Sequence, residues 1–215
     1  GFEDTLLVTR GGYGRWAGLT EERMKNMVKT DRATPLVSRS LIAGIPERSD
    51  YKGAIIRGLD ESATKSAIKA LLDDGVDAIA ISFLWSFYNQ TNELRAQELV
   101  KEINPNIYTS ISSNIAPTPG EYERTSTTVI NAYAGDIARN YIENLADLLQ
   151  KNKYSGPVMI MQGYGGLLLA SEAADRAIGM LECGPAAGVI GSKALGELLN
   201  QKDVIATDMG GTTFK

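Results

Sequence analysis

The sequence contains no histidine and a single cysteine, and these two absences narrow the chemistry that it can carry. Without histidine, the chain has no Ser-His or Cys-His nucleophile arrangement and no histidine-containing zinc site. The single Cys183 excludes an internal disulfide and a cysteine-rich metal cluster, and since it has no adjacent base we interpret it as a packed small residue. Any chemistry in this chain therefore rests on carboxylates, hydroxyls, backbone amides and cations.

The sequence also lacks an excess of basic residues and a long apolar run. Its 215 residues include 22 Lys and Arg against 26 Asp and Glu, with no stripe of basic and aromatic residues, so we expect no nucleic-acid partner. No apolar run approaches the ~20 residues that span a bilayer, and no signal segment opens the chain. The 43% hydrophobic and 22% charged residues predict a soluble globular protein in the cytoplasm, with no membrane partner.

The first half of the chain alternates between helix-like and strand-like patterns. Asp60 is a predicted N-cap, Gly75 is predicted to end that helix, and residues 76–81 have the pattern of a strand. The unit then repeats, with Asn89 as the predicted cap of the next helix and residues 107–111 as the next strand. Helices alternating with strands at this spacing predict βα units, and hence an α/β layer architecture.

A long helix is predicted over residues 125–151. Apolar residues step along it by three or four positions, at Ile130, Ala134, Ile137, Tyr141, Leu145 and Leu148. This spacing places them on one face of a helix. Gly135 interrupts the pattern at a cost of about 1 kcal/mol relative to alanine, so we expect a bend or a close packing contact there.

Two glycine-containing segments follow the long helix. The glycine-rich loop 162–166 comes directly after a predicted strand over 158–161, and such a loop is where α/β sheets usually hold ligands. Further on, Gly184-Pro185 is predicted to open a helix with proline at its first position. Gly188 and its small neighbours leave one side of that helix nearly bare, so another backbone or a nucleotide can approach closely.

The last eight residues, 208–215, combine a carboxylate with a turn that suits a phosphate group. Residues 204–207 are predicted to form a short buried strand, which Asp208 ends. The glycine pair 210–211 can bring backbone N–H groups close to an anion, the threonine pair 212–213 adds hydroxyl donors, and Asp208 can hold Mg²⁺ or its water. An ordinary hairpin turn beside an aspartate has the same pattern, so D-x-G-G-T alone leaves both interpretations open.

D-x-G-G-T after a hydrophobic strand resembles the phosphate loops of the actin, sugar-kinase and heat-shock-chaperone ATPase superfamily. The surrounding residues resemble one branch of it, the hydantoinase A / 5-oxoprolinase / ketone carboxylase family. Five motifs carry the resemblance in the family's order: GFED at 1–4, EYERTSTTV at 121–129, MQGYGGL at 161–167, CGPAAGV at 183–189 and DMGGTTFK at 208–215.

The resemblance implies an α/β fold, as a fragment of an actin/sugar-kinase-like (ribonuclease H-like) ATPase with an inserted α/β subdomain. Residues 1–40 are then expected to be a remnant of the N-terminal lobe with a connecting helix, and 41–120 the α/β subdomain. Residues 121–215 would hold the long helix and part of the nucleotide-binding core. Because family members carry an earlier phosphate loop and a long C-terminal continuation, we expect an excised region that has no ATPase activity alone.

The resemblance also implies ATP and Mg²⁺ as cofactors and a role for residues of the terminal loop. Asp208 would be the catalytic carboxylate, acting through Mg²⁺ or positioning the attacking group. The residues expected to hold the phosphates are Gly210, Gly211, Thr212, Thr213 and Lys215.

Three other sets of residues are candidates for functional contacts. Glu123, Arg124 and Thr125 form either a helix-capping cluster or a contact to an anion or substrate. The second set, which would contact the substrate or the nucleotide, is Gln162, Gly163 and Tyr164. By resemblance, the third set lies on a helix that crosses the domain interface and comprises Gly184, Pro185 and Gly188.

The family resemblance implies ATP-dependent activation of a carbonyl compound by phosphoryl transfer. Where hydantoinases and oxoprolinases tend to have G-G-T-S-T-D and Q-S-N-G-G, this chain has GGTTFK at 210–215 and QGYGG at 162–166. These departures resemble acetone and acetophenone carboxylase subunits, so carboxylation of a ketone is expected. Hydrolysis of a cyclic amide (N-methylhydantoin or 5-oxoproline) and a noncatalytic assembly subunit are the alternatives. The expected partners are a carbonyl or cyclic amide substrate and a hydantoinase B-like subunit.

Overall fold

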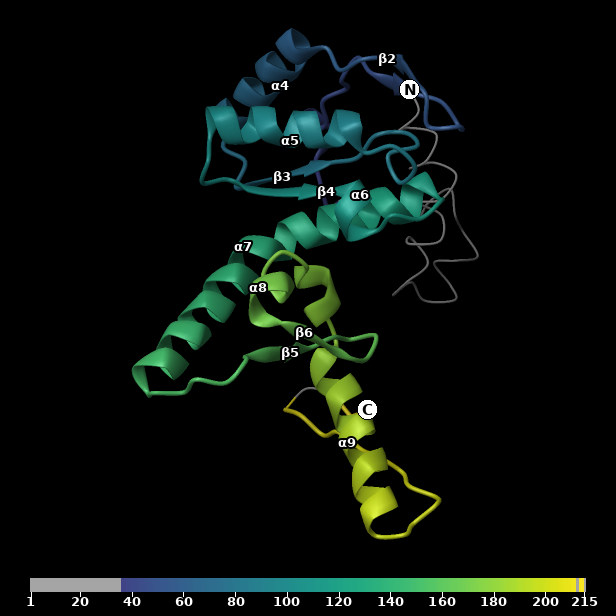
Figure 1. Cartoon of the computed structure of the whole chain (residues 1–215), viewed down its shortest axis with the longest axis vertical. Helices are drawn as coiled ribbons and strands as arrows, with labels where there is room; N and C mark the ends of the chain where they lie inside the picture. Colours follow the sequence, from purple (N-terminus) through teal and green to yellow (C-terminus); the bar gives the residue numbers. More distant parts are fainter. Residues whose placement is uncertain (1–35, 212, 215) are drawn as a thin grey trace, which may run out of the picture.

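The structure, a computed structural model, describes residues 36–211, 213 and 214 (Figure 1). The expected N-terminal remnant lies almost entirely outside the described residues, as do Thr212 and Lys215. The elements are η1 (Arg39–Leu41), β1 (Arg48–Ser49), β2 (Ile55–Arg57), α4 (Glu61–Asp73), β3 (Ala78–Ile81), α5 (Thr91–Ile103), β4 (Tyr108–Ile111), α6 (Ser112–Ile115), α7 (Glu121–Lys151), β5 (Met159–Met161), β6 (Leu167–Leu169), α8 (Ala170–Ala173), η2 (Ala177–Met180) and α9 (Cys183–Leu198). Helices and strands are mixed along the chain, which confirms the predicted α/β class.

An α/β layer occupies one end of the molecule. β3 and β4 pair in parallel, with Ala78 opposite Tyr108 and Ile81 opposite Ile111. α5, with α4 beside it, covers one face of this pair, and α7 runs along the other (Figure 1). The buried core between them consists of Ile68, Ile79, Ile81, Ala96, Leu99, Val100 and Ile111. The predicted repeat of helix and strand is therefore confirmed.

Local hydrogen bonds explain where α4 and α5 begin. The Asp60 carboxylate accepts the Ala63 N–H at 3.0 Å, which confirms Asp60 as the N-cap of α4. α5 begins at Thr91, one residue later than an Asn89 N-cap requires. Asn89 still supports this helix start, because its Oδ1 accepts the Thr91 N–H at 3.0 Å while its amide group donates to the Gly53 carbonyl at 2.7 Å.

The long helix α7 has 31 residues, about 46 Å at 1.5 Å per residue. It begins at Glu121, four residues before the predicted start, and ends at Lys151 as predicted. Gly135 lies against the ring of Tyr108, and a Cβ atom at this position would collide with the ring. The glycine in the helix is therefore explained by close packing on β4.

A second, smaller unit packs on the other half of α7. β5 and β6 pair antiparallel, with Met159 opposite Leu169, so the glycine-rich loop is the connection of a hairpin. The Gln162 N–H donates to the Gly166 carbonyl at 3.0 Å, and the glycine pair 165–166 has φ angles of 92° and 83° that allow the reversal. The loop directly follows a strand, as predicted, and that strand belongs to a two-stranded sheet separate from β3 and β4.

α9 and the residues after it extend away from the rest of the molecule (Figure 1). The helix begins at Cys183, so Pro185 is its third residue and not its first. Residues 204–207 were predicted to be a buried strand, but they are exposed and lie in no strand. The physical reason is that no described strand pairs with them, and a buried segment with unpaired backbone groups would be unstable. Within the described residues, no helix is long and apolar enough to cross a membrane.

Candidate functional site

The terminal loop forms a tight hairpin turn. The Gly210 N–H donates to the Thr213 carbonyl at 2.9 Å, and Met209 and Phe214 form an isolated antiparallel bridge around this turn. Asp208 directly precedes the bridge and is exposed, as are Gly210 and Gly211. The loop therefore presents one carboxylate and accessible backbone to solvent. The expected contacts of Thr212 and Lys215 lie outside the described residues.

The donor set of this loop fits one kind of metal site. Mg²⁺ keeps several of its waters and is usually bound by one or two carboxylates together with substrate phosphates. Asp208 supplies one such carboxylate, and in the part of the chain that the structure describes no three Cys, Asp or Glu side chains gather around a metal position. Asp208 thus fits a Mg²⁺ site that water and a phosphate complete, and does not fit a cage of protein ligands.

The N-terminal part of α9 has an open side. Cβ atoms added at Gly184, Gly188 or Gly191 would meet nothing within 4 Å. Gly196 differs, because a Cβ atom there would come within 2.6 Å of a Val204 methyl group. The segment after α9 therefore folds back onto the helix at Gly196, while the glycines of the first turns leave room for another backbone or a ligand.

The glycine-rich hairpin loop is hydrogen-bonded to neighbouring segments at its base, and its tip is exposed to solvent. Gln162 is fully buried, and its amide group donates to the Ile160 carbonyl at 3.1 Å. The Gly163 N–H donates to the Gly179 carbonyl at 2.6 Å, so the loop is bound to the segment that leads into α9. Tyr164, by contrast, presents its ring to solvent. Of these candidate contact residues, Tyr164 has the side chain that a ligand can reach.

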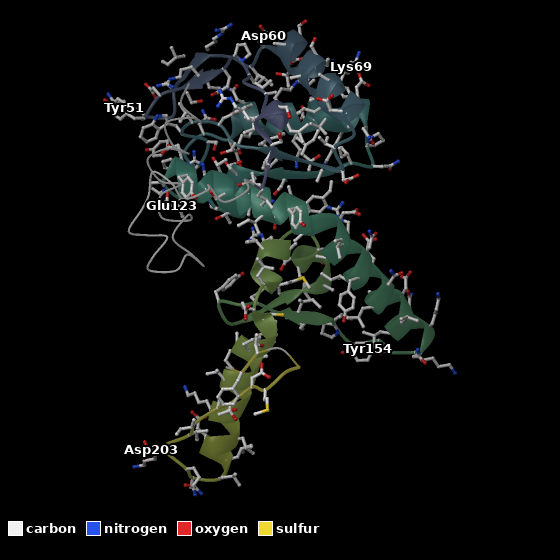
Figure 2. All side chains as sticks on the ribbon, turned by 180° about the vertical axis from the view of Figure 1, so that it is seen from behind. Tyr51, Asp60, Lys69, Glu123, Tyr154 and Asp203 are labelled. Carbon is white, nitrogen blue, oxygen red and sulfur yellow. The ribbon has the colours of Figure 1, made fainter. Side chains whose placement is uncertain are left out.

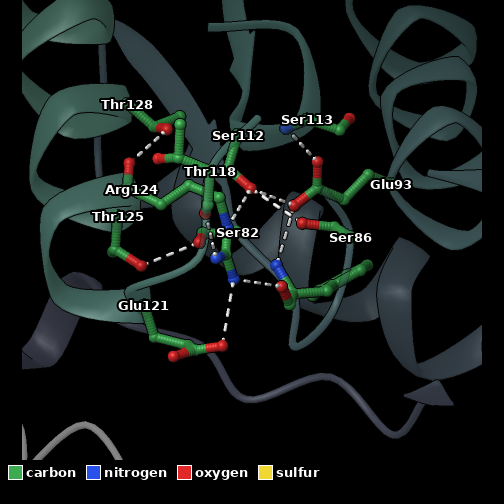
Figure 3. A network of polar contacts seen from close by, with 11 residues as sticks. Ser82, Ser86, Glu93, Ser112, Ser113, Thr118, Glu121, Arg124, Thr125 and Thr128 are labelled. Carbon is green, nitrogen blue, oxygen red and sulfur yellow. Dashed lines mark hydrogen bonds and ion pairs between the residues drawn. The ribbon is translucent and has the colours of Figure 1, made fainter. Parts of the chain in front are cut away.

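Arg124 lies at the centre of a buried polar network (Figure 3). Its guanidinium donates to the Ser112 hydroxyl at 3.2 Å, the Thr118 carbonyl at 3.1 Å and the Phe83 carbonyl at 3.0 Å. Glu121 lies 3.7 Å away at the start of the same helix. The guanidinium therefore connects α7 to the loops that follow β3 and α6.

Glu93 supplies the opposite charge in the same network, and sequence reasoning missed it. It is fully buried and accepts hydrogen bonds from the Phe83 N–H at 2.8 Å, the Ser112 hydroxyl at 2.6 Å and the Ser113 N–H at 2.8 Å. Ser112 thus bridges the carboxylate of Glu93 and the guanidinium of Arg124. An acidic residue in the first turn of a helix is ordinary, so the sequence carried no signal for this role.

The other two members of the predicted cluster differ from Arg124. The Thr125 hydroxyl is 2.7 Å from that of Ser82, within the packed interface between α7 and the end of β3. Glu123 is exposed in the first turn of α7 (Figure 2). The geometry therefore favours a packing role for Arg124 and Thr125, while Glu123 points toward solvent.

A second polar cluster connects the α/β layer to the smaller unit across α7. The Tyr108 hydroxyl donates to the Asp175 carbonyl at 3.1 Å, and the Asn131 amide group donates to the same carbonyl at 3.1 Å. Asn131 also accepts the Ile178 N–H at 3.0 Å. Arg139 lies 4.5 Å from the centre of the Tyr108 ring and pairs with the Asp175 carboxylate at 2.6 Å. These contacts hold the segment that leads into α9 against the layer.

Comparison with known proteins assigns the chain to a family. Residues 3–104 match the hydantoinase/oxoprolinase N-terminal region, and residues 124–215 match hydantoinase/oxoprolinase itself. The chain belongs to the hydantoinase/oxoprolinase family. The family resemblance of the five sequence motifs is thereby confirmed.

Individual members of the family are similar over most or all of the chain. It is 34% identical to the acetophenone carboxylase gamma subunit of Aromatoleum aromaticum, covering 100% of this chain and 30% of that protein. It is also 34% identical to the caprolactamase subunit alpha of Pseudomonas jessenii, covering 83% of this chain and 26% of that protein. The nucleotide-free structure of acetone carboxylase, from work on ATP-dependent acetone carboxylation, superposes with a TM-score of 0.84 at 28% identity, over 100% of this chain and 30% of that one. The chain thus spans at most 30% of the length of these relatives.

Proposed function

We propose that this chain is part of an ATP-dependent subunit that binds nucleotide phosphates at the terminal loop and activates a carbonyl compound by phosphoryl transfer. The observation that carries the proposal is the exposed Asp208 carboxylate directly before a glycine turn whose backbone is accessible. The similarity to the acetone carboxylase structure extends over the full chain, including this loop, and supports the same proposal.

The geometry of the loop suggests a separate role for each of its residues. The Gly210 amide is already bonded within the turn, so the phosphate contacts would come from the backbone beyond it, at Gly211 and Thr213, together with the predicted contacts of Thr212 and Lys215. Asp208 would orient Mg²⁺ through its water shell. When bound, Mg²⁺ would neutralise charge on the β and γ phosphates of ATP.

The proposed chemistry makes a poor reactant reactive by phosphorylating an oxygen atom. For a ketone, phosphorylation of the enol oxygen precedes transfer of a carboxyl group. We favour this carboxylation because the similarity to the acetophenone carboxylase subunit and to the acetone carboxylase structure covers the entire chain. The sequences of the hairpin loop and the terminal loop support the same choice.

Hydrolysis of a cyclic amide is the second candidate. Its specific support is the 34% identity to a caprolactamase subunit, since a lactam is a cyclic amide that water opens. In this case phosphorylation of the amide oxygen would precede attack by water. A noncatalytic assembly subunit with the same fold is the third candidate, in which the nucleotide only supports a conformation.

We further propose the organisation of the longer protein to which such a region would belong. Residues 41–120 would form an inserted α/β subdomain. Residues 121–215 would contribute the long helix and part of an actin-like nucleotide-binding core, in which α9 crosses the domain interface with Gly184, Pro185 and Gly188 on its open part. The protein would act in the cytoplasm, together with a hydantoinase B-like subunit.

Substrate-dependent ATP hydrolysis tests the proposal. The full-length subunit, combined with its hydantoinase B-like partner, is assayed with ATP and Mg²⁺ plus acetone or acetophenone and bicarbonate, plus a cyclic amide, or with neither. We expect ATP turnover to rise with a ketone and bicarbonate. A rise with the cyclic amide alone would support ring hydrolysis, and ATP binding without turnover under any condition would support the assembly subunit.

A further inference from the structure

One side of the lower half of α7 carries a row of exposed apolar side chains. Tyr133, Ile137, Tyr141 and Leu148 are 71%, 75%, 59% and 57% exposed. Their spacings of four, four and seven residues place them on one stripe of the helix. In Figures 1 and 2 the small unit of α8, β5 and β6 lies on one side of this half of α7, and the opposite side faces outward.

The apolar stripe gathers four exposed side chains on one face of the helix. An aromatic side chain presents about 150–250 Å², so the two tyrosines alone expose on the order of 250 Å² of largely apolar surface. The largest exposed apolar patch of a monomeric protein typically covers a few hundred Å² and often has a function. Exposed tyrosines are also among the residues that contribute most to binding at protein interfaces. The stripe therefore has the composition of a binding surface.

A second row of side chains, with acidic character, lies beside the apolar stripe. Asp136, Asn140, Glu143 and Asp147 are exposed and follow one another at spacings of four, three and four residues. At 100° per residue, this row lies directly alongside the apolar stripe, on one flank of it. Among residues 36–211, 213 and 214, no basic side chain forms an ion pair with Glu143 or Asp147. The charges along this flank are therefore available to a partner.

We infer that this two-row face of α7, the apolar stripe with its acidic flank, binds a different subunit, and that the contacting surface of that subunit is apolar with Lys or Arg along one edge. The acidic row selects basic residues on the partner, because opposite charges across an interface steer association and fix register. A second copy of this chain fits less well. In a symmetric antiparallel pair of α7 helices, both acidic rows would lie on the same side of the interface and repel each other.

The inference rests on the proposed function, because that function includes a hydantoinase B-like partner subunit. It adds the surface on which that partner binds. Relatives of this chain bear the names of subunits of acetophenone carboxylase, caprolactamase and acetone carboxylase, which agrees with assembly from different chains.

Assembly measured without nucleotide or substrate tests the inference independently of catalysis. The full-length subunit and its hydantoinase B-like partner are mixed, and the dissociation constant is measured by sedimentation velocity for wild type and for the Ile137→Ser/Tyr141→Ser variant. We expect the variant to bind on the order of 100-fold more weakly, since exposed aromatic and aliphatic anchors dominate such interfaces. The matched control is Tyr51→Ser/Ile56→Ser, which removes two exposed apolar residues from the β1–β2 hairpin, outside the apolar stripe, and should bind normally.

A charge variant keeps the inference testable if the apolar variant misfolds. Glu143→Lys/Asp147→Lys should weaken binding about tenfold at low salt, and the difference from wild type should shrink at high salt. The melting temperature of the isolated subunit should stay unchanged in both variants.

Three outcomes would overturn the inference. Normal partner binding by both variants would remove α7 from the interface. A lowered melting temperature of the isolated subunit with normal partner binding would mean that another segment of the same protein covers the stripe. Loss of a homodimer, with partner binding intact, would assign the surface to a second copy. A different result would separate the two proposals. If the α7 variants bind the partner weakly as expected, but ATP turnover of the wild type never depends on a ketone or a cyclic amide, the binding surface is supported and the proposed activity is contradicted.

Discussion

The apolar residues of the α/β layer are largely buried, whereas those of the C-terminal segment are largely exposed. In the layer, Leu99 is fully buried, and the charged groups of Glu93 and Arg124 are enclosed and hydrogen-bonded. In the C-terminal segment, Leu198 is 80% exposed and Ile205 is 92% exposed. The apolar residues of the layer therefore form a core among themselves. The segment that carries the candidate phosphate loop has the composition of a packed element, but most of its apolar side chains stay exposed among the described residues.

This difference indicates which parts of the chain depend on contacts beyond the described residues. Hydrogen bonds and burial within residues 59–151 determine the geometry of the layer. The terminal loop has a defined turn, but the apolar residues around it, such as Met209 and Phe214, are exposed. Variants in the two regions should therefore differ in kind: those in the layer should change stability, and those in the loop should change activity.

The largest expected effect comes from removing Arg124. Arg124→Leu removes the cation that Ser112 links to the buried Glu93 carboxylate, and it leaves the Phe83 and Thr118 carbonyls without a donor. Breaking a buried charge arrangement on one side typically costs about 3–5 kcal/mol. We expect a loss of this size in the free energy of unfolding of the full-length protein, measured by urea denaturation with tryptophan fluorescence, since Trp85 lies close to this network.

The matched control for this variant is another arginine in the layer. Arg95 pairs with Glu61, Glu98 and Glu102 at the surface of α4 and α5, where water screens the charges. Arg95→Leu should therefore change stability much less than Arg124→Leu. If both variants lose the same stability, the buried network contributes no more than a surface ion pair and the comparison between the regions weakens.

Asp208→Asn should affect activity and leave the fold intact. In the full-length enzyme with its partner subunit, we expect ATP turnover to fall on the order of 100-fold, about 2.7 kcal/mol of transition-state stabilisation, because the carboxylate would act most strongly when charge develops on the phosphates. Much of the nucleotide affinity and the melting temperature should remain. Turnover and melting temperature measured on the same preparation check both expectations.

Asp203→Asn is the control for this second variant, since Asp203 is also exposed and precedes the same loop (Figure 2). It should behave as wild type in both measurements. If Asp208 only supports the turn, its substitution would instead lower stability by about 1 kcal/mol with turnover nearly intact. Wild-type turnover in Asp208→Asn would exclude the residue from the proposed site.

The layer was largely predictable from the sequence because its determinants are local. Asp60 caps α4 as its position before an apolar stripe indicates, and the strand at 107–111 is confirmed as β4. Gly135 was predicted to mark a close contact or a bend, and it packs on Tyr108. Each of these features depends on side-chain type at a fixed spacing along the chain.

The features that the sequence did not predict depend on contacts between segments that are distant along the chain. Residues 204–207 have the hydrophobicity of a strand, but a strand also needs a partner, and sequence periodicity does not supply one. The pairing of β5 with β6 was also not predicted, because a strand's composition does not indicate which strand it pairs with. Glu93 escaped notice for a related reason, since its burial depends on Ser112 and Ser113, about 20 residues away along the chain.

The smallest expected effect concerns the connection between the two units, at Tyr108. Burial raises the pKa of the Tyr108 hydroxyl above its ordinary value of 10.0, against smaller lowering effects of Asn131 and Arg139. The folded state therefore favours the neutral phenol, and this contribution to stability is fully present below pH 10 and is lost as the pH rises through the higher pKa of the folded state. Tyr108→Phe should lose about 1 kcal/mol of stability at neutral pH, because the Asp175 carbonyl loses one of its donors. Its stability should also decline less steeply than that of wild type above pH 10. Tyr88→Phe, which removes an exposed hydroxyl, is the control, and parallel curves for wild type and Tyr108→Phe in chemical denaturation from pH 8 to 11 would contradict the prediction.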